Sequence, residues 1–176
     1  ALRKKANNNI QSKKTYALNW KIDTTKTSTL RFKGYEAETI KSEITEFERL
    51  KYDTTKPFTK DVKYQNYFKP TLEIEIPTAY IIPQGWHRII DLLKLNQVEM
   101  RQLERDSAFT VEIYKIEDYK TRQQAYEGHY PHYNVSISLK TEKLAFKKWD
   151  YLIKTNQPSF RYIIETLEPQ APDSFF

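Results

Sequence analysis

The histidines are the residues best suited to chemistry in this 176-residue chain, which has three of them and no cysteine. His129 and His132 form an H-x-x-H pair, and Glu127 lies close by. Zinc sites in proteins need at least three converging side-chain ligands, which are often imidazoles and carboxylates. Gly128 and Pro131 disfavour a helix here, so the sequence does not fix the three side chains in one geometry. We therefore predict a loop of exposed or aromatic-stacked histidines and no metal site, with Glu127, His129 and His132 as the alternative ligand set.

Sequence motifs of hydrolytic and phosphate chemistry are missing. Neither H-E-x-x-H nor H-x-x-E occurs, since His87, for example, is followed three positions later by Ile90. There is no G-x-S-x-G, no Walker loop and no G-x-G-x-x-G, and the chain has only three glycines from which to build one. The lack of cysteine excludes disulfides, thiolate metal sites and a cysteine nucleophile. The sequence therefore predicts no catalytic residue, no cofactor in this chain, and no enzyme activity for the chain alone.

Composition indicates a folded protein with an uneven charge. Hydrophobic residues make up 39% and aromatic residues 14%, which is enough for a packed core. Of the net charge of +6, residues 1–70 hold 16 Lys/Arg against 8 Asp/Glu, and residues 71–176 hold 13 against 15. Basic residues alternate with aromatic ones in 60–69, as in grooves that bind single-stranded nucleic acid. Acidic residues are interspersed, so ordinary strand faces are the favoured interpretation. No apolar run approaches the ~20 residues of a membrane span.

Two amphipathic helices are predicted within a β-rich chain. Trp86, Ile89, Ile90 and Leu93 are spaced as one helical face over about 86–96, and Phe160, Ile163, Ile164 and Leu167 do the same over about 159–167. Short aromatic or alternating segments predict strands at 16–22, 29–35, 71–76, 79–82, 98–103, 109–116 and 133–140. The expected fold is α+β, predominantly antiparallel β and sandwich-like. The expected organisation is a linker over 1–14, a basic, aromatic β-rich segment over 15–70, and an α+β segment over 71–176 that packs with it or stands apart.

The sequence also predicts three local features. Val135, Ile137 and Leu139 alternate with polar residues and are expected to face the core. Residues 144–153 are expected to pair with 133–140 as a hairpin. The tetrapeptide Asp-Thr-Thr-Lys occurs at 23–26 and again at 53–56, and it predicts Asx-type turns between strands.

Several long stretches carry a resemblance to known proteins. They are A-Y-I-I-P-Q-G-W (79–86), L-L-K-L-N (92–96), Y-E-G-H (126–129), D-Y-L-I-K-T-N-Q-P (150–158) and E-T-L-E-P-Q-A-P-D-S-F-F (165–176), with L-R-K-K-A (2–6), N-W-K-I-D-T-T-K (19–26) and F-K-G-Y-E (32–36) before them. These stretches resemble the region that follows the catalytic domain in bacterial zinc metallocarboxypeptidase-like proteins of the carboxypeptidase A-type clan. The chain ends at Phe176 inside a motif that continues in such proteins, which suggests a cut or processed polypeptide.

The resemblance implies a role without catalysis. In such proteins the zinc ligands, the substrate-binding Arg and the general-base Glu lie upstream of the matching region, and no position here matches them. The implied function is a non-catalytic accessory domain of a secreted or periplasmic protein, with zinc in an upstream peptidase domain of the same polypeptide. Its partners would be that domain and a peptide substrate. The alternative is a stand-alone module that binds carbohydrate, peptide or nucleic acid through the basic aromatic segment.

Overall fold

The computed structural model describes residues 12–176. These residues divide by their packing into two compact units. The first holds residues 12–19 and 70–176, and the second holds residues 20–69. Residues 1–11, which are most of the predicted linker over 1–14, lie outside the described residues.

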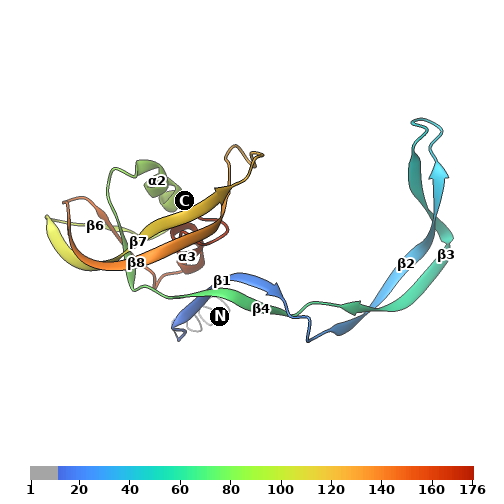
Figure 1. Ribbon diagram of the computed structural model, residues 1–176, viewed down its shortest axis with the longest axis horizontal. Coiled ribbons are helices and arrows are strands. Elements are labelled where there is room, and N and C mark those ends of the chain that lie inside the picture. Colours follow the sequence, from blue (N-terminus) through green and yellow to red (C-terminus); the bar gives the residue numbers. More distant parts are fainter. Residues whose placement is uncertain (1–11) are drawn as a thin grey trace. The chain divides into compact units, whose positions relative to one another are not determined.

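The described residues confirm the β-rich α+β class. The elements follow the order β1 (Thr15–Ile22), β2 (Ser28–Lys41), β3 (Glu48–Tyr64), β4 (Phe68–Glu75), β5 (Ala79–Ile82), α2 (His87–Leu95), β6 (Arg101–Gln102), β7 (Ser107–Thr121), β8 (His132–Phe146), β9 (Tyr151–Lys154) and α3 (Phe160–Leu167) (Figure 1). Within residues 12–176 the strands pair as β1–β4, β2–β3 and β7–β8, and a three-stranded sheet has the order β5–β9–β6.

The second unit is a long two-stranded ribbon made by β2 and β3. The two strands are antiparallel, from Ser28 opposite Tyr64 to Lys41 opposite Glu48. The register shifts between Tyr35, which faces Pro57, and Glu36, which faces Asp53, so residues 54–56 form a bulge in β3. This bulge divides the ribbon into a proximal half, residues 28–35 and 57–64, and a distal half, residues 36–53.

The two Asp-Thr-Thr-Lys sequences make the same local bonds in different settings. The Thr25 Oγ1 hydroxyl donates to Asp23 Oδ1 at 2.6 Å, and the Thr25 amide donates to the same oxygen at 3.2 Å. The Thr55 hydroxyl and amide donate to Asp53 Oδ1 at 2.6 and 3.0 Å. The first copy is the predicted turn between β1 and β2. The prediction is wrong for the second copy, which lies inside β3 at the bulge, because the Asx bond satisfies backbone groups wherever the ladder is interrupted.

The core of the first unit gathers around the two helices. One cluster of buried side chains comes from β5, β9, α2, α3 and the segment after α2: Ile82, Ile90, Leu93, Val98, Ile153 and Ile163. A second cluster places α3 against β1 and the C-terminal segment: Leu18, Phe160, Ile164 and Ala171. Both predicted helices are confirmed, because their apolar spacing lets one face pack on these strands. Trp86 is an exception, since it precedes α2 and is 61% exposed.

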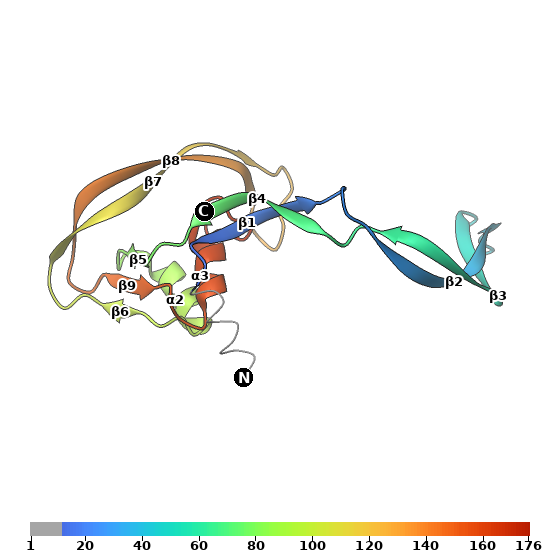
Figure 2. The ribbon, with the colours of Figure 1, turned by 90° about the horizontal axis from the view of Figure 1, so that it is seen from below.

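Strands β7 and β8 form a second ribbon, which curves over the side of this unit that holds the helices (Figure 2). The predicted 133–140/144–153 hairpin is wrong, because Leu144 continues β8 and faces Phe109 of β7. β9 pairs instead with β5 and β6. Val135 and Ile137 are half-buried as expected, whereas Leu139 is 59% exposed. Alternation of apolar and polar residues identifies the two faces of a strand. It does not show how far along the strand one of those faces is covered by the rest of the protein.

The predicted strand over 98–103 is reduced in the structure to the two residues of β6. Val98 lies in the buried cluster, where its amide donates to the Leu93 carbonyl at 3.0 Å after α2 ends. Val98 is therefore apolar because it packs in the buried cluster with α2, and not because it belongs to a strand.

Candidate functional site

A hollow of about 1570 Å³ lies at the end of the β7–β8 ribbon in the first unit. Its walls come from α2, the loop between β7 and β8, and residues 169–176. The rings and cations that line it include Arg88, Arg122, Tyr126, Tyr130, Tyr133 and Phe176. Ligand sites combine large apolar or aromatic surfaces with a few polar groups, and this hollow has that composition.

A tight turn shapes the loop that holds His129. The Tyr126 amide donates to the His129 carbonyl at 2.8 Å, and the His129 amide donates to the Tyr126 carbonyl at 3.1 Å. Glu127 and Gly128, the two residues between them, have φ of 50° and 83°. Two successive left-handed residues closed by reciprocal bonds are typical of a type I′ hairpin turn, which favours glycine at its second position.

His132, at the start of β8, packs against two aromatic rings in tilted arrangements. Its ring lies 4.6 Å from the Tyr119 ring and 5.1 Å from the Phe176 ring, measured between centroids. Its Nδ1 lies 2.9 Å from Thr121 Oγ1. Glu127, His129 and His132 all line the hollow. Over residues 12–176, however, no three His, Asp or Glu side chains are grouped so that they could hold a metal ion.

Two guanidinium groups, those of Arg88 and Arg122, line the hollow together with the acidic residues Glu127 and Asp173. Arg122 lies over the Tyr133 ring at 5.9 Å, and Arg88 reaches the hollow from α2. Neither forms an ion pair with an acidic side chain of the described residues. Guanidinium groups bind carboxylates in a bidentate manner, and the Tyr rings can stack on flat groups. The sequence analysis missed both arginines, because Arg88 is on the polar side of a helix and no local spacing links it to Arg122.

A buried hydrogen-bonded cluster anchors one wall of the hollow. Glu168, only 1% exposed, accepts hydrogen bonds from the hydroxyls of Tyr80 and Tyr114. Burial raises the pKa of the Glu168 carboxyl, and the two hydroxyls oppose that rise. Burial and the adjacent Glu168 also raise the pKa of Tyr80 and of Tyr114. Residues 169–176, which form one wall of the hollow, follow Glu168 directly in the chain. Gln170 Nε2 holds this segment to β8 by donating to the Val135 carbonyl at 2.9 Å.

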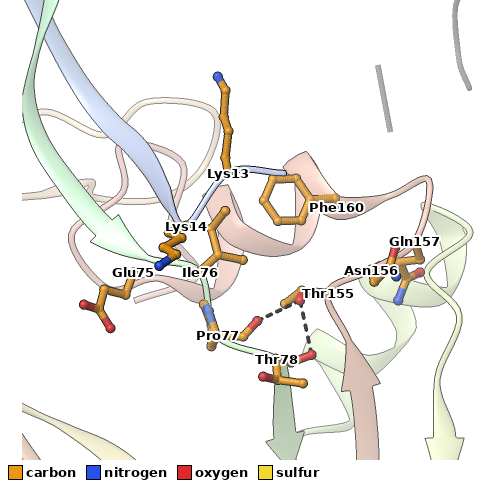
Figure 3. A pocket seen from close by; sticks show the side chains of 10 residues that line it. All are labelled: Lys13, Lys14, Glu75, Ile76, Pro77, Thr78, Thr155, Asn156, Gln157 and Phe160. Carbon is orange, nitrogen blue, oxygen red and sulfur yellow. Dashed lines mark hydrogen bonds between the residues drawn. The ribbon is translucent and has the colours of Figure 1, made fainter. Parts of the chain in front are cut away.

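A smaller pocket of about 600 Å³ lies beside the start of α3 (Figure 3). Two of its polar side chains, those of Thr155 and Gln157, are engaged in holding the fold. The Thr155 hydroxyl donates to the Pro77 carbonyl at 2.7 Å, and the Gln157 side-chain Nε2 donates to the Glu99 and Lys154 backbone carbonyls at 3.0 and 2.6 Å. The hydrogen-bonding groups of Thr155 and Gln157 are therefore already occupied by the backbone.

Comparison with known proteins gives one kind of relative. The chain is 29% identical to Carboxypeptidase 2 of Trichophyton rubrum over 107 residues, which is 61% of this chain and 20% of that protein. It is also 29% identical to Carboxypeptidase 2 of Trichophyton tonsurans over 99 residues, 56% of this chain and 18% of that protein. The chain is similar to carboxypeptidases. It spans about a fifth of the length of these relatives, which are fungal, so the expected bacterial parent stays a prediction.

No family model matches the chain, and no solved structure matches it. None of the helices in residues 12–176 is long and apolar enough to cross a membrane.

Proposed function

We propose that this chain is a non-catalytic accessory domain of a secreted or periplasmic zinc carboxypeptidase-like protein, and that its hollow holds part of the peptide substrate. The observation that carries the proposal is that the hollow is lined by aromatic rings and by the guanidinium groups of Arg88 and Arg122. Neither guanidinium group forms an ion pair with a described residue. A carboxypeptidase acts at the carboxyl end of a peptide, and a terminal carboxylate is an anion that guanidinium groups bind well. The similarity to carboxypeptidases supports that choice of ligand.

Binding of labelled peptides tests the hollow. A fluorescent peptide that ends in Tyr with a free carboxylate is compared with its C-terminal amide by polarisation. We expect the carboxylate form to bind about tenfold more tightly, because a charge-assisted pair adds about 1.5–3 kcal/mol at most and this site is partly solvated. The Arg88→Ala, Arg122→Ala double variant should lose this preference, and Arg49→Ala on the β2–β3 ribbon should keep it. Equal binding of both peptides by the unaltered chain would refute the proposed ligand.

A hydrolysis assay tests the accessory role. The chain alone, with and without added Zn²⁺, should release no C-terminal residue from the same peptides. Stoichiometric bound zinc that is lost in His129→Ala would contradict the proposal, because it would make the histidine loop a metal site.

The alternative, a module that binds an anionic polymer through residues 15–70, has weaker support. The distal half of the ribbon holds six acidic against three basic residues, so an anionic polymer would meet like charge there. Salt-sensitive binding of heparin that maps to the proximal half would favour this alternative.

A further inference from the structure

The β2–β3 ribbon carries equal and opposite charges on its two halves. The proximal half (28–35 and 57–64) has four basic residues and one acidic residue, a net charge of +3: Arg31, Lys33, Lys60, Lys63 and Asp61. The distal half (36–53) has six acidic and three basic residues, a net charge of −3: Glu36, Glu38, Glu43, Glu46, Glu48, Asp53, Lys41, Arg49 and Lys51. The bulge at 54–56 separates the two halves.

Most of these charges form no ion pair within 4 Å with a described residue, although Arg31 lies opposite Asp61, Glu38 opposite Lys51 and Lys41 opposite Glu48 in the register. The described ion pairs within the ribbon are Lys56–Asp53 at 3.1 Å and Lys41–Glu46 at 4.0 Å. Glu36, Glu43 and Glu48 form no ion pair with a described residue, and the same holds for Arg31, Lys33 and Lys63. The two sets therefore remain able to attract charges on another molecule.

Both halves also expose large apolar side chains. In the proximal half, Leu30 faces Val62 across the strands, and Phe32 lies 6.2 Å from Phe58 between ring centroids. The exposed fractions are 43% for Leu30, 47% for Phe32 and 37% for Val62. In the distal half, the apolar side chains that are more than half exposed are Ile44, Phe47, Leu50 and Tyr52. A two-stranded ribbon is marginally stable alone in water, so burial of these side chains against a second ribbon would stabilise it.

We infer that two copies of this chain pair through their β2–β3 ribbons in antiparallel orientation. The acidic distal half of each ribbon lies against the basic proximal half of the other. The charges of the two halves are complementary only in this orientation, since a parallel pair would place +3 on +3 and −3 on −3. The two-fold axis passes near the bulge, so both contacts are the same and the assembly closes at a dimer. This inference concerns the second unit and does not depend on the proposed role of the hollow.

Two charge variants test the arrangement. Variant 1, Glu36→Lys, Glu43→Lys, Glu48→Lys, changes the distal half from −3 to +3. Variant 2, Arg31→Glu, Lys33→Glu, Lys63→Glu, changes the proximal half from +3 to −3. Each variant then carries net charge of one sign on both halves of its ribbon. The dissociation constant of its dimer should rise at least about tenfold, because like charges face each other. A 1:1 mixture should form a heterodimer, since every contact in it joins opposite charges.

Sedimentation equilibrium of the full chain at about 100 μM measures the outcome. The unaltered chain should be dimeric at low salt. Its dimerisation affinity should fall in about 1 M salt, where the Debye length is about 3 Å. An unaltered chain that stays monomeric at low salt overturns the inference. So does a mixture of the two variants that associates no better than each variant alone. Circular dichroism confirms that both variants keep their strands.

Single thiols test the orientation without altering charge, because the natural chain has no cysteine. Thr45→Cys places a thiol in the tip turn, and Thr29→Cys places one at the base of the ribbon. On mild oxidation, a mixture of the two should give the mixed disulfide in preference to either symmetric one. Preferential linkage of two Thr45→Cys chains to each other would show parallel pairing and overturn the inference.

Discussion

Removing the Tyr80 hydroxyl should destabilise the first unit, because the buried Glu168 carboxyl would lose a hydrogen-bond donor. Glu168 is 1% exposed and accepts hydrogen bonds from Tyr80 and Tyr114. Tyr80→Phe leaves the ring in the core and takes away one of the two donors. A buried carboxyl that loses a hydrogen-bond donor loses about 1–3 kcal/mol of stabilisation, so we expect the free energy of unfolding to fall by about 2 kcal/mol at pH 7.

Urea unfolding followed by tryptophan fluorescence measures this loss. With a slope of about 2 kcal/mol/M, the midpoint should fall by about 1 M. Tyr162→Phe is the matched control, because its ring packs on the same cluster and its hydroxyl forms no hydrogen bond with a described residue. That variant should change the free energy of unfolding by less than about 0.5 kcal/mol. Equal losses in the two variants would show that the Glu168 cluster does not stabilise the fold and would refute the reasoning.

The pH dependence of the same variant gives a further check. Burial raises the pKa of the folded Glu168 carboxyl, so between the unfolded and the folded pKa the folded state holds a proton that the unfolded state has released. Stability from this group is therefore full below the unfolded pKa and declines as pH rises through the folded pKa. Tyr80→Phe takes away a donor to the carboxylate, which should move that decline to higher pH.

Two other predictions concern the core and the alkaline range. Ile163→Ala should lower the free energy of unfolding by about 3 kcal/mol, because Ile163 is fully buried on α3, whereas Leu95→Ala, at a site 78% exposed, should change it by less than about 0.5 kcal/mol in the same urea assay. A similar loss in both would show that the helix face is not packed as described. Burial, followed by the bond from its hydroxyl to Glu165 at 2.8 Å, raises the pKa of Tyr16 to about 12. The unfolded tyrosine ionises near pH 10, so stability should fall between about pH 10 and about pH 12, and less steeply in Tyr16→Phe. Identical slopes for the two proteins in alkaline urea titrations would contradict this assignment.

Features that depend on neighbouring residues were predictable from the sequence. The spacing of Phe160, Ile163 and Ile164 predicted α3, because side chains three and four positions apart share one face of a helix. The turn at Asp23 followed from a carboxylate that accepts hydrogen bonds from a residue two positions later.

The choice of strand partners was not predictable in this way. The apolar pattern of residues 151–154 predicts a strand but does not indicate its partner. In the structure these residues pair with β5 and β6 and not with β8. The second Asp-Thr-Thr-Lys copy repeats the bonds of the first, yet its place in a bulge depends on the register with β2. Register is a property of two strands together, and one strand alone does not define it.

The sequence by itself determined both helices and most of the strands, the absence of cysteine, the small number of histidines, and the uneven charge. Only the tertiary structure brought Arg88 to the same hollow as Arg122, and Tyr80 to Glu168 from 88 positions away. It also showed that the two halves of the ribbon are opposite in charge, because a bulge and a register define those halves. The physical reason is that side-chain periodicity acts over a few residues, whereas contacts between distant residues are selected by the burial and hydrogen bonding of the whole fold.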